Sequence, residues 1–80
     1  MSGAVVEFSN GKKVHYSNVF SGGFSNKGGK PHIVLTLIDQ TKEALEDAIS
    51  IMIVDDSYLA EHYSLFGIEY NMDGKRINNE

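Results

Sequence analysis

The chain has 80 residues, enough for one compact domain but too few for a second hydrophobic core. It has no cysteine, which excludes disulfides and thiolate zinc sites as a supplement to that core. The net charge is −4, yet residues 1–32 carry four lysines and one glutamate, whereas residues 39–61 carry seven carboxylates and one lysine. This asymmetry bears on the partners that the surface attracts, not on the fold.

The beginning of the chain, Met-Ser-Gly-Ala-Val-Val-Glu, has neither the basic start nor the apolar run of a signal peptide. No later segment approaches the roughly 18 consecutive apolar residues of a membrane span. We therefore expect a cytoplasmic protein that forms a single α+β domain over residues 1–80 and has no membrane partner.

Residues 4–16 alternate apolar and polar side chains around a central Asn-Gly pair, which predicts a β-hairpin. A two-residue turn would pair Phe8 with Lys13 and so mix apolar and polar side chains on one face. A three-residue loop that ends with Gly11 in the left-handed conformation instead pairs Glu7 with Lys13. We prefer this register because it gathers the apolar side chains on one face. These are Ala4, Val6, Phe8, Val14 and Tyr16.

Residues 21–31 hold four of the chain's eight glycines and its only proline, so we expect a flexible Gly-rich loop there. This segment lacks the correctly placed lysine and the following helix of a phosphate-binding loop, which excludes that function. The burial of Phe24 decides its role: an exposed ring would anchor a partner, whereas a buried ring would belong to the core. The next segment, residues 32–38, is apolar on both faces, which predicts a central strand.

Residues 42–54 carry apolar side chains at helical spacing from Leu45 to Ile53, which predicts one main amphipathic helix. The acidic residues on its opposite face are Glu43, Glu46 and Asp47. A run of β-branched side chains from Ile51 to Val54 leaves the end of this helix open.

The last third of the chain predicts a short helix and a closing hairpin. The acidic pair that follows the main helix either breaks it or caps an extra short helix over residues 57–64. Residues 67–77 predict a hairpin in which a two-residue Asp73-Gly74 turn pairs Tyr70 with Ile77.

Together these elements predict an α+β domain in β-β-β-α-β-β order, with one main helix packed on one face of an antiparallel-rich sheet of roughly five strands. The other face of the sheet would remain apolar, so we expect a homodimer or a bound partner to cover it. The residues on this face are Val5, Val19, Val34 and Ile38.

The sequence does not indicate a catalytic, cofactor-binding or metal-binding site. The three histidines show none of the short spacings that are typical of zinc ligands. Residues 69–80 match a calcium loop only in part, because glutamate replaces the first aspartate and no exiting helix follows. We therefore expect no enzymatic activity, no cofactor and no metal.

The charge distribution favours a small, non-catalytic protein-binding module of the inhibitor or adaptor type. It would bind a protein with a basic surface through the acidic helical face or through an exposed sheet edge. The residues expected to bind that protein are Glu43, Glu46, Asp47, Asp55 and Asp56.

Two alternatives remain open from the sequence. The first is a module for single-stranded nucleic acid, with lysines on phosphates and an aromatic ring stacked on a base. Its residues would be Lys12, Lys13, Phe24, Lys27 and Lys30. The second is a structural subunit that assembles beyond a dimer.

Overall fold

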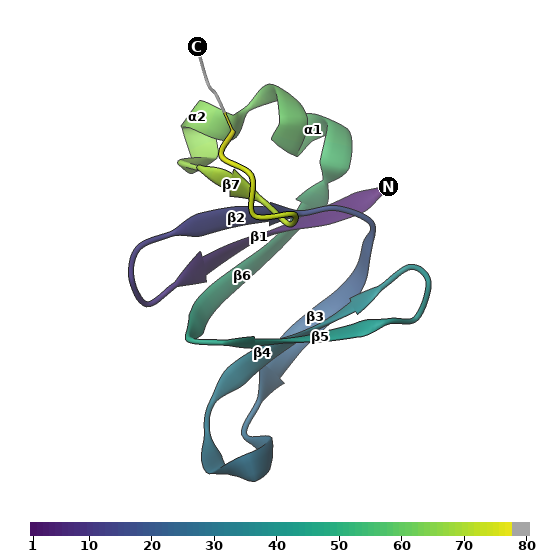
Figure 1. The fold of residues 1–80 in the computed structure, drawn as a ribbon. Helices are drawn as coiled ribbons and strands as arrows, with labels where there is room; N and C mark the ends of the chain where they lie inside the picture. Colours follow the sequence, from purple (N-terminus) through teal and green to yellow (C-terminus); the bar gives the residue numbers. More distant parts are fainter. Residues whose placement is uncertain (78–80) are drawn as a thin grey trace.

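A computed structural model describes residues 1–77, and describes only the backbone of Lys27. The chain is a small α+β domain that consists mostly of strands, arranged in two antiparallel-rich sheets with two short helices (Figure 1). The elements are β1 (Ser2–Phe8), β2 (Lys13–Tyr16), β3 (Val19–Ser25), the 3₁₀ turn η1 (Lys27–Gly29), β4 (His32–Leu37), β5 (Lys42–Glu46), β6 (Ala48–Asp55), α1 (Asp56–Glu61), α2 (Tyr63–Phe66) and β7 (Tyr70–Asn71).

The two sheets and the helices form three layers. One sheet has the strand order β6-β1-β2-β7 and the other β3-β4-β5, and β7 joins the first sheet parallel to β2. Figure 1 shows α1 and α2 on one side of the four-stranded sheet and the three-stranded sheet on its other side. Neither helix is long or apolar enough to cross a membrane, within the part of the chain that the structure describes.

The first hairpin confirms the predicted register. Glu7 pairs with Lys13, and the loop closes through a hydrogen bond of 2.9 Å that the Gly11 N–H donates to the Phe8 carbonyl oxygen. Gly11 has a φ of 88°, so this residue takes the left-handed conformation that a three-residue loop requires of its last member. The apolar face of this hairpin therefore points between the two sheets, as its alternating pattern predicts.

The predicted main helix over residues 42–54 is wrong. This segment forms β5 and β6, which belong to different sheets, and Asp47 turns the chain between them with a φ of 65°. Strand β6 pairs with β1 from Ala48 opposite Phe8 to Asp55 opposite Ser2, with one register shift that leaves Ile49 without a partner residue on β1. Because β-branched side chains favour strands and a ready partner strand was present, long-range pairing outweighed the helical spacing.

The predicted loop over residues 21–31 is shorter than expected. Residues 21–25 belong to β3 and pair with β4 as far as Ser25 opposite His32, so only residues 26–31 connect the two strands. Strand β3 continues through Gly22 and Gly23 because neither glycine takes a positive φ. The predicted strand over residues 32–38 is confirmed as β4, the central strand of its sheet.

The closing hairpin is displaced by one residue from its predicted register. Tyr70 bridges Arg76 rather than Ile77, and the Asn71 N–H donates to the Lys75 carbonyl oxygen at 3.0 Å. Gly74 has a φ of 79°, so it ends a three-residue loop in the same way as Gly11 in the first hairpin. The Asn71 side-chain oxygen accepts hydrogen bonds from two backbone N–H groups of this loop, which favours the longer turn.

The second face of the four-stranded sheet is covered. The short helix predicted over residues 57–64 is present as α1 and α2, and Leu59 and Ile68 are buried there against Val5. Val19 is also buried, in the cluster between the two sheets. Val34 is half-buried and Ile38 is 47% exposed, so only part of the expected apolar face is covered and the homodimer stays a prediction. The buried residues between the sheets are Ala4, Val6, Val19, Ile33, Leu35, Leu45 and Ala48.

Candidate functional site

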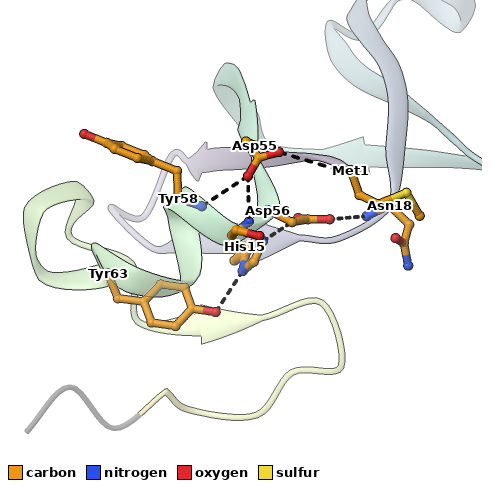
Figure 2. A network of polar contacts seen from close by, with 8 residues as sticks. Met1, His15, Asn18, Asp55, Asp56, Tyr58 and Tyr63 are labelled. Carbon is orange, nitrogen blue, oxygen red and sulfur yellow. Dashed lines mark hydrogen bonds and ion pairs between the residues drawn. The ribbon is translucent and has the colours of Figure 1, made fainter.

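A partly buried polar network joins the two helices to the four-stranded sheet (Figure 2). His15 on β2 is only 5% exposed, and its ring lies between Asp56 at the start of α1 and Tyr63 at the start of α2. Nε2 lies 2.9 Å from Asp56 Oδ1, and Nδ1 lies 2.9 Å from the Tyr63 hydroxyl. Because an ionised carboxylate only accepts, Nε2 donates to Asp56, and in the neutral imidazole Nδ1 accepts from Tyr63.

Asp56 also connects this network to the neighbouring backbone. The Asn18 N–H donates to the second oxygen of Asp56 at 3.1 Å, which ties the β2–β3 corner to the helix. Burial and the nearby Asp56 charge raise the pKa of Tyr63, so its hydroxyl keeps its proton. A Cβ on Gly3 would collide with Asp56 Oδ1, so this position in β1 needs glycine. The network is therefore an internal clasp, with its polar groups directed toward one another.

Asp55 is likewise engaged within the chain. Its carboxylate accepts hydrogen bonds from the backbone N–H groups of Ser57 and Tyr58, which caps α1. It also lies 3.5 Å from the amino group of Met1. The Tyr58 N–H and the other partners lower the pKa of Asp55.

An open cleft lies where three segments far apart in sequence meet. We call it the hairpin cleft, because the first hairpin and the closing hairpin form two of its walls and the β5–β6 corner forms the third. Its volume is about 420 Å³, which falls within the usual range for small-ligand sites. Its aromatic lining is Phe8, Tyr16 and Tyr70, and its charged lining is Lys12, Glu46 and Asp47.

Two interactions determine the electrostatics of the hairpin cleft. The Lys12 ammonium lies 4.3 Å from the centre of the Tyr70 ring, a cation–π contact. Burial and the negative charge of Glu43 raise the pKa of Tyr16, which keeps its phenol neutral. The cleft therefore combines neutral aromatic rings with more carboxylates than cations.

A second open surface is the outer edge of β3. This strand is at the end of the three-stranded sheet, and its seven residues, Val-Phe-Ser-Gly-Gly-Phe-Ser, carry no charge. Phe20 is 75% exposed and Phe24 is 67% exposed. Phe24 pairs with Ile33, which is fully buried, whereas the Phe24 ring is mostly exposed. The outer strand of this hairpin therefore lies beyond the core at Phe24.

The structure separates the five carboxylates that were expected to form one binding face. Glu43 and Glu46 lie on β5 and Asp47 at the corner, whereas Asp55 and Asp56 hold α1. No helix presents the first three, so the acidic helical face does not exist. Glu46 is 3.7 Å from Lys30 in an exposed ion pair.

The residues of the nucleic-acid alternative are also divided. Lys12 and Lys13 belong to the first hairpin, and Lys30 lies near the turn between β3 and β4, a different end of the molecule (Figure 1). The side chain of Lys27 lies outside the described part of the structure. Phe24 is exposed, as an anchor for a partner would be.

Sequence reasoning missed Tyr70 as a surface feature. A three-residue loop in the closing hairpin places Tyr70 opposite Arg76, and Gly74 was the available signal for that loop. Tyr16 lies on the face of the first hairpin that its alternating pattern predicts, and it also lines the hairpin cleft.

Among residues 1–77, no three metal-ligating side chains come together in a way that would hold an ion. No family model, curated protein or solved structure matches the chain. A function must therefore be argued from the geometry of the surfaces themselves.

Proposed function

We propose that this protein is a non-catalytic protein-binding module that captures an extended segment of another protein by strand addition to β3. The observation that carries the proposal is an uncharged seven-residue edge strand with two exposed phenylalanines, Phe20 and Phe24. An edge strand presents unpaired backbone donors and acceptors, which another extended chain can satisfy.

The neighbouring strand β6 enlarges this surface. It is the edge strand of the other sheet, and it contacts β3 where Gly22 lies against Ile51. Ile49 and Ile53 on β6 are 53% and 45% exposed. Two edge strands with exposed apolar side chains thus lie along one side of the domain, and such a surface favours binding to a partner over exposure to water.

The chemistry of the partner follows from what β3 lacks. Gly22 and Gly23 lie in the middle of the strand, and the space above Gly23 is open, so a bulky apolar residue of the added segment can occupy it. A pairing of two copies of β3 centred on these glycines would place glycine opposite glycine, where no side-chain contact forms. We therefore assign the edge to a different protein that offers an extended, apolar segment.

A matched pair of substitutions at Gly23 tests the strand-addition mode. A Cβ at this position meets no atom within 4 Å, so both Gly23→Ser and Gly23→Lys fit the folded chain. A lysine on an edge strand opposes pairing with another strand, because its charge would be desolvated. Partner binding should be lost in Gly23→Lys and retained in Gly23→Ser.

The partner would first be identified by photo-crosslinking from position 24 in the native host, with nuclease treatment as a control. Affinity for the purified partner would then be measured for Phe24→Ser and for Leu65→Ser, since Leu65 is 69% exposed on α2, outside the β3 edge. Loss of binding in the first variant alone supports the proposal. Equal binding by both variants, or a complex that nuclease dissolves, would overturn it.

A further inference from the structure

We propose that the hairpin cleft binds an organic cation, namely an alkylammonium or a guanidinium group. The cleft and the β3 edge share no residues, so this site does not depend on the proposed function. The cation would lie against the aromatic rings of the cleft, with carboxylates at its rim.

The walls of the cleft come from backbone that is held in place. Phe8 and Tyr16 project from paired strands, and β7 fixes Tyr70 beside Val14 on β2. The Ser9 N–H donates to the Asp47 carbonyl oxygen at 2.8 Å, which joins the first hairpin to the β5–β6 corner. The site is therefore formed before any ligand arrives, which lowers the entropic cost of binding.

The chain itself shows that the cleft accepts a cation. The Lys12 ammonium lies over the Tyr70 ring at 4.3 Å, close to the ring face that a ligand ammonium would use. Among the described residues, no carboxylate forms an ion pair with Lys12, so the ring is the principal partner of this exposed side chain. Lys12 thus acts as an internal competitor that a stronger cation can displace.

The charge of the rim selects against other ligands. Glu46 and Asp47 line the cleft, and Glu43 is close enough to raise the pKa of Tyr16. Lys12 is the one cation among the lining residues, and Lys30, outside the lining, lies 3.7 Å from Glu46 in an exposed ion pair. An anion would meet repulsion from this rim, and a neutral ligand would gain no charge–charge attraction from the carboxylates. A cationic group on an alkyl stem uses both the rings and the charges.

Nuclear magnetic resonance titration of the full chain with tetramethylammonium tests this assignment, and tert-butanol serves as the neutral probe of similar shape. Aromatic resonances of Phe8, Tyr16 and Tyr70 should shift with the cation and remain in place with the alcohol. Tyr70→Leu should weaken binding about twofold to fivefold, the range expected for an exposed cation–π contact. Tyr58→Leu is the control, because Tyr58 lies on α1 outside the cleft.

A variant at Lys12 separates this proposal from a purely structural role for the cleft. Lys12→Met keeps the apolar stem but removes the internal competitor and its positive charge, so affinity for tetramethylammonium should rise about twofold to fivefold. Lys12 is exposed, so this change does not threaten the fold. Unchanged or weaker affinity in Lys12→Met, or equal shifts with tert-butanol, would overturn the proposal.

The source of the cation is decided by a second pair of ligands. A short peptide with one trimethyllysine flanked by glycines, and the same peptide with glutamine, would be titrated in parallel. Tighter binding of the trimethyllysine peptide than of tetramethylammonium would assign the site to a side chain of a protein. Equal affinities would assign it to a free small cation, and no discrimination against the glutamine peptide would contradict a cation site of either kind.

Discussion

Gly22 on β3 lies directly against Ile51 on β6, and this contact sets how closely the two sheets approach. A Cβ added to Gly22 would lie 2.6 Å from Ile51 Cδ1 and 2.8 Å from Leu35 Cδ2, both closer than carbon atoms can pack. Gly23, the next residue, would meet nothing within 4 Å. Two adjacent glycines in one strand therefore have different roles.

Alanine substitutions at these two glycines should separate the roles. Gly22→Ala should lower the free energy of unfolding by about 1–3 kcal/mol, since the added methyl overpacks the contact between the sheets. Gly23→Ala should leave stability unchanged or slightly raised, because the methyl enters open space and restricts the unfolded chain. Urea unfolding measures both values, and equal effects would show that the two sheets do not pack at Gly22.

His15 should contribute to stability through the clasp rather than through apolar burial. His15→Leu should lower the free energy of unfolding by about 2–3 kcal/mol, because Asp56 and Tyr63 lose their shared partner. After that change, Tyr63→Phe should cost less than the roughly 1 kcal/mol that it costs in the native chain. A double-mutant cycle by urea unfolding measures this coupling.

His32→Gln is the control for His15, since the His32 ring is partly exposed and its one hydrogen bond among the described residues is to the backbone oxygen of Lys30. Its effect should stay within about 0.5 kcal/mol. Additive effects of the substitutions at residues 15 and 63 would contradict a connected network.

Asp55 should make stability depend on pH in the acidic range. The Tyr58 N–H, then the amino terminus and the Ser57 N–H, hold the pKa of this carboxyl below its ordinary value of 3.8. A group whose pKa is lower in the folded chain stabilises above its unfolded pKa, and this stabilisation is lost as pH falls through the folded pKa. The melting temperature should therefore fall more steeply below pH 3.8 in the native chain than in Asp55→Asn.

Glu61→Gln, on the same helix, is the matched control for Asp55→Asn. Its melting temperature should follow that of the native chain across the same acidic range. If Asp55→Asn and the native chain show parallel curves, the helix cap does not depend on the ionised carboxylate.

Asp47 should respond to substitution as a corner residue, not as part of a helix. With a φ of 65°, it lies in the left-handed region that glycine enters without strain. Asp47→Gly should therefore raise the free energy of unfolding by up to about 1 kcal/mol, whereas the same change inside a helix would cost about 1 kcal/mol. Ser50→Gly, inside β6, should lower the free energy of unfolding. An equal loss of stability in both variants would argue that residues 42–54 form a helix.

Phe24 and Ile33 face each other across β3 and β4 but should differ in their contributions to stability. Ile33 is fully buried, so Ile33→Ala should cost about 2–5 kcal/mol. Phe24→Ala should cost less than about 0.5 kcal/mol, because the ring is mostly exposed. Thermal or urea unfolding compares them, and a large loss for Phe24→Ala would assign the ring to the core and weaken its role as an anchor.

Much of the local structure could be predicted from the sequence because short-range chemistry controls it. The register of the first hairpin follows from alternation and from one glycine that must be left-handed, and β4 follows from an apolar run too short for a buried helix. The Asp55 cap also belongs to this class, since an aspartate before a helix bonds to N–H groups two and three residues away. In each case the atoms that decide the structure are near one another in the chain.

Only the tertiary structure decided the course of residues 42–54 and the composition of the surfaces. The apolar spacing of that segment fits a helix, but the pairing of β6 with β1 and a turn at Asp47 made two strands in different sheets. The hairpin cleft brings together Phe8, Glu46 and Tyr70, which no local pattern connects. Backbone pairing and burial between distant segments depend on the whole chain. A sequence pattern covers only roughly ten to twenty neighbouring residues and so cannot show which distant segment will pair with them.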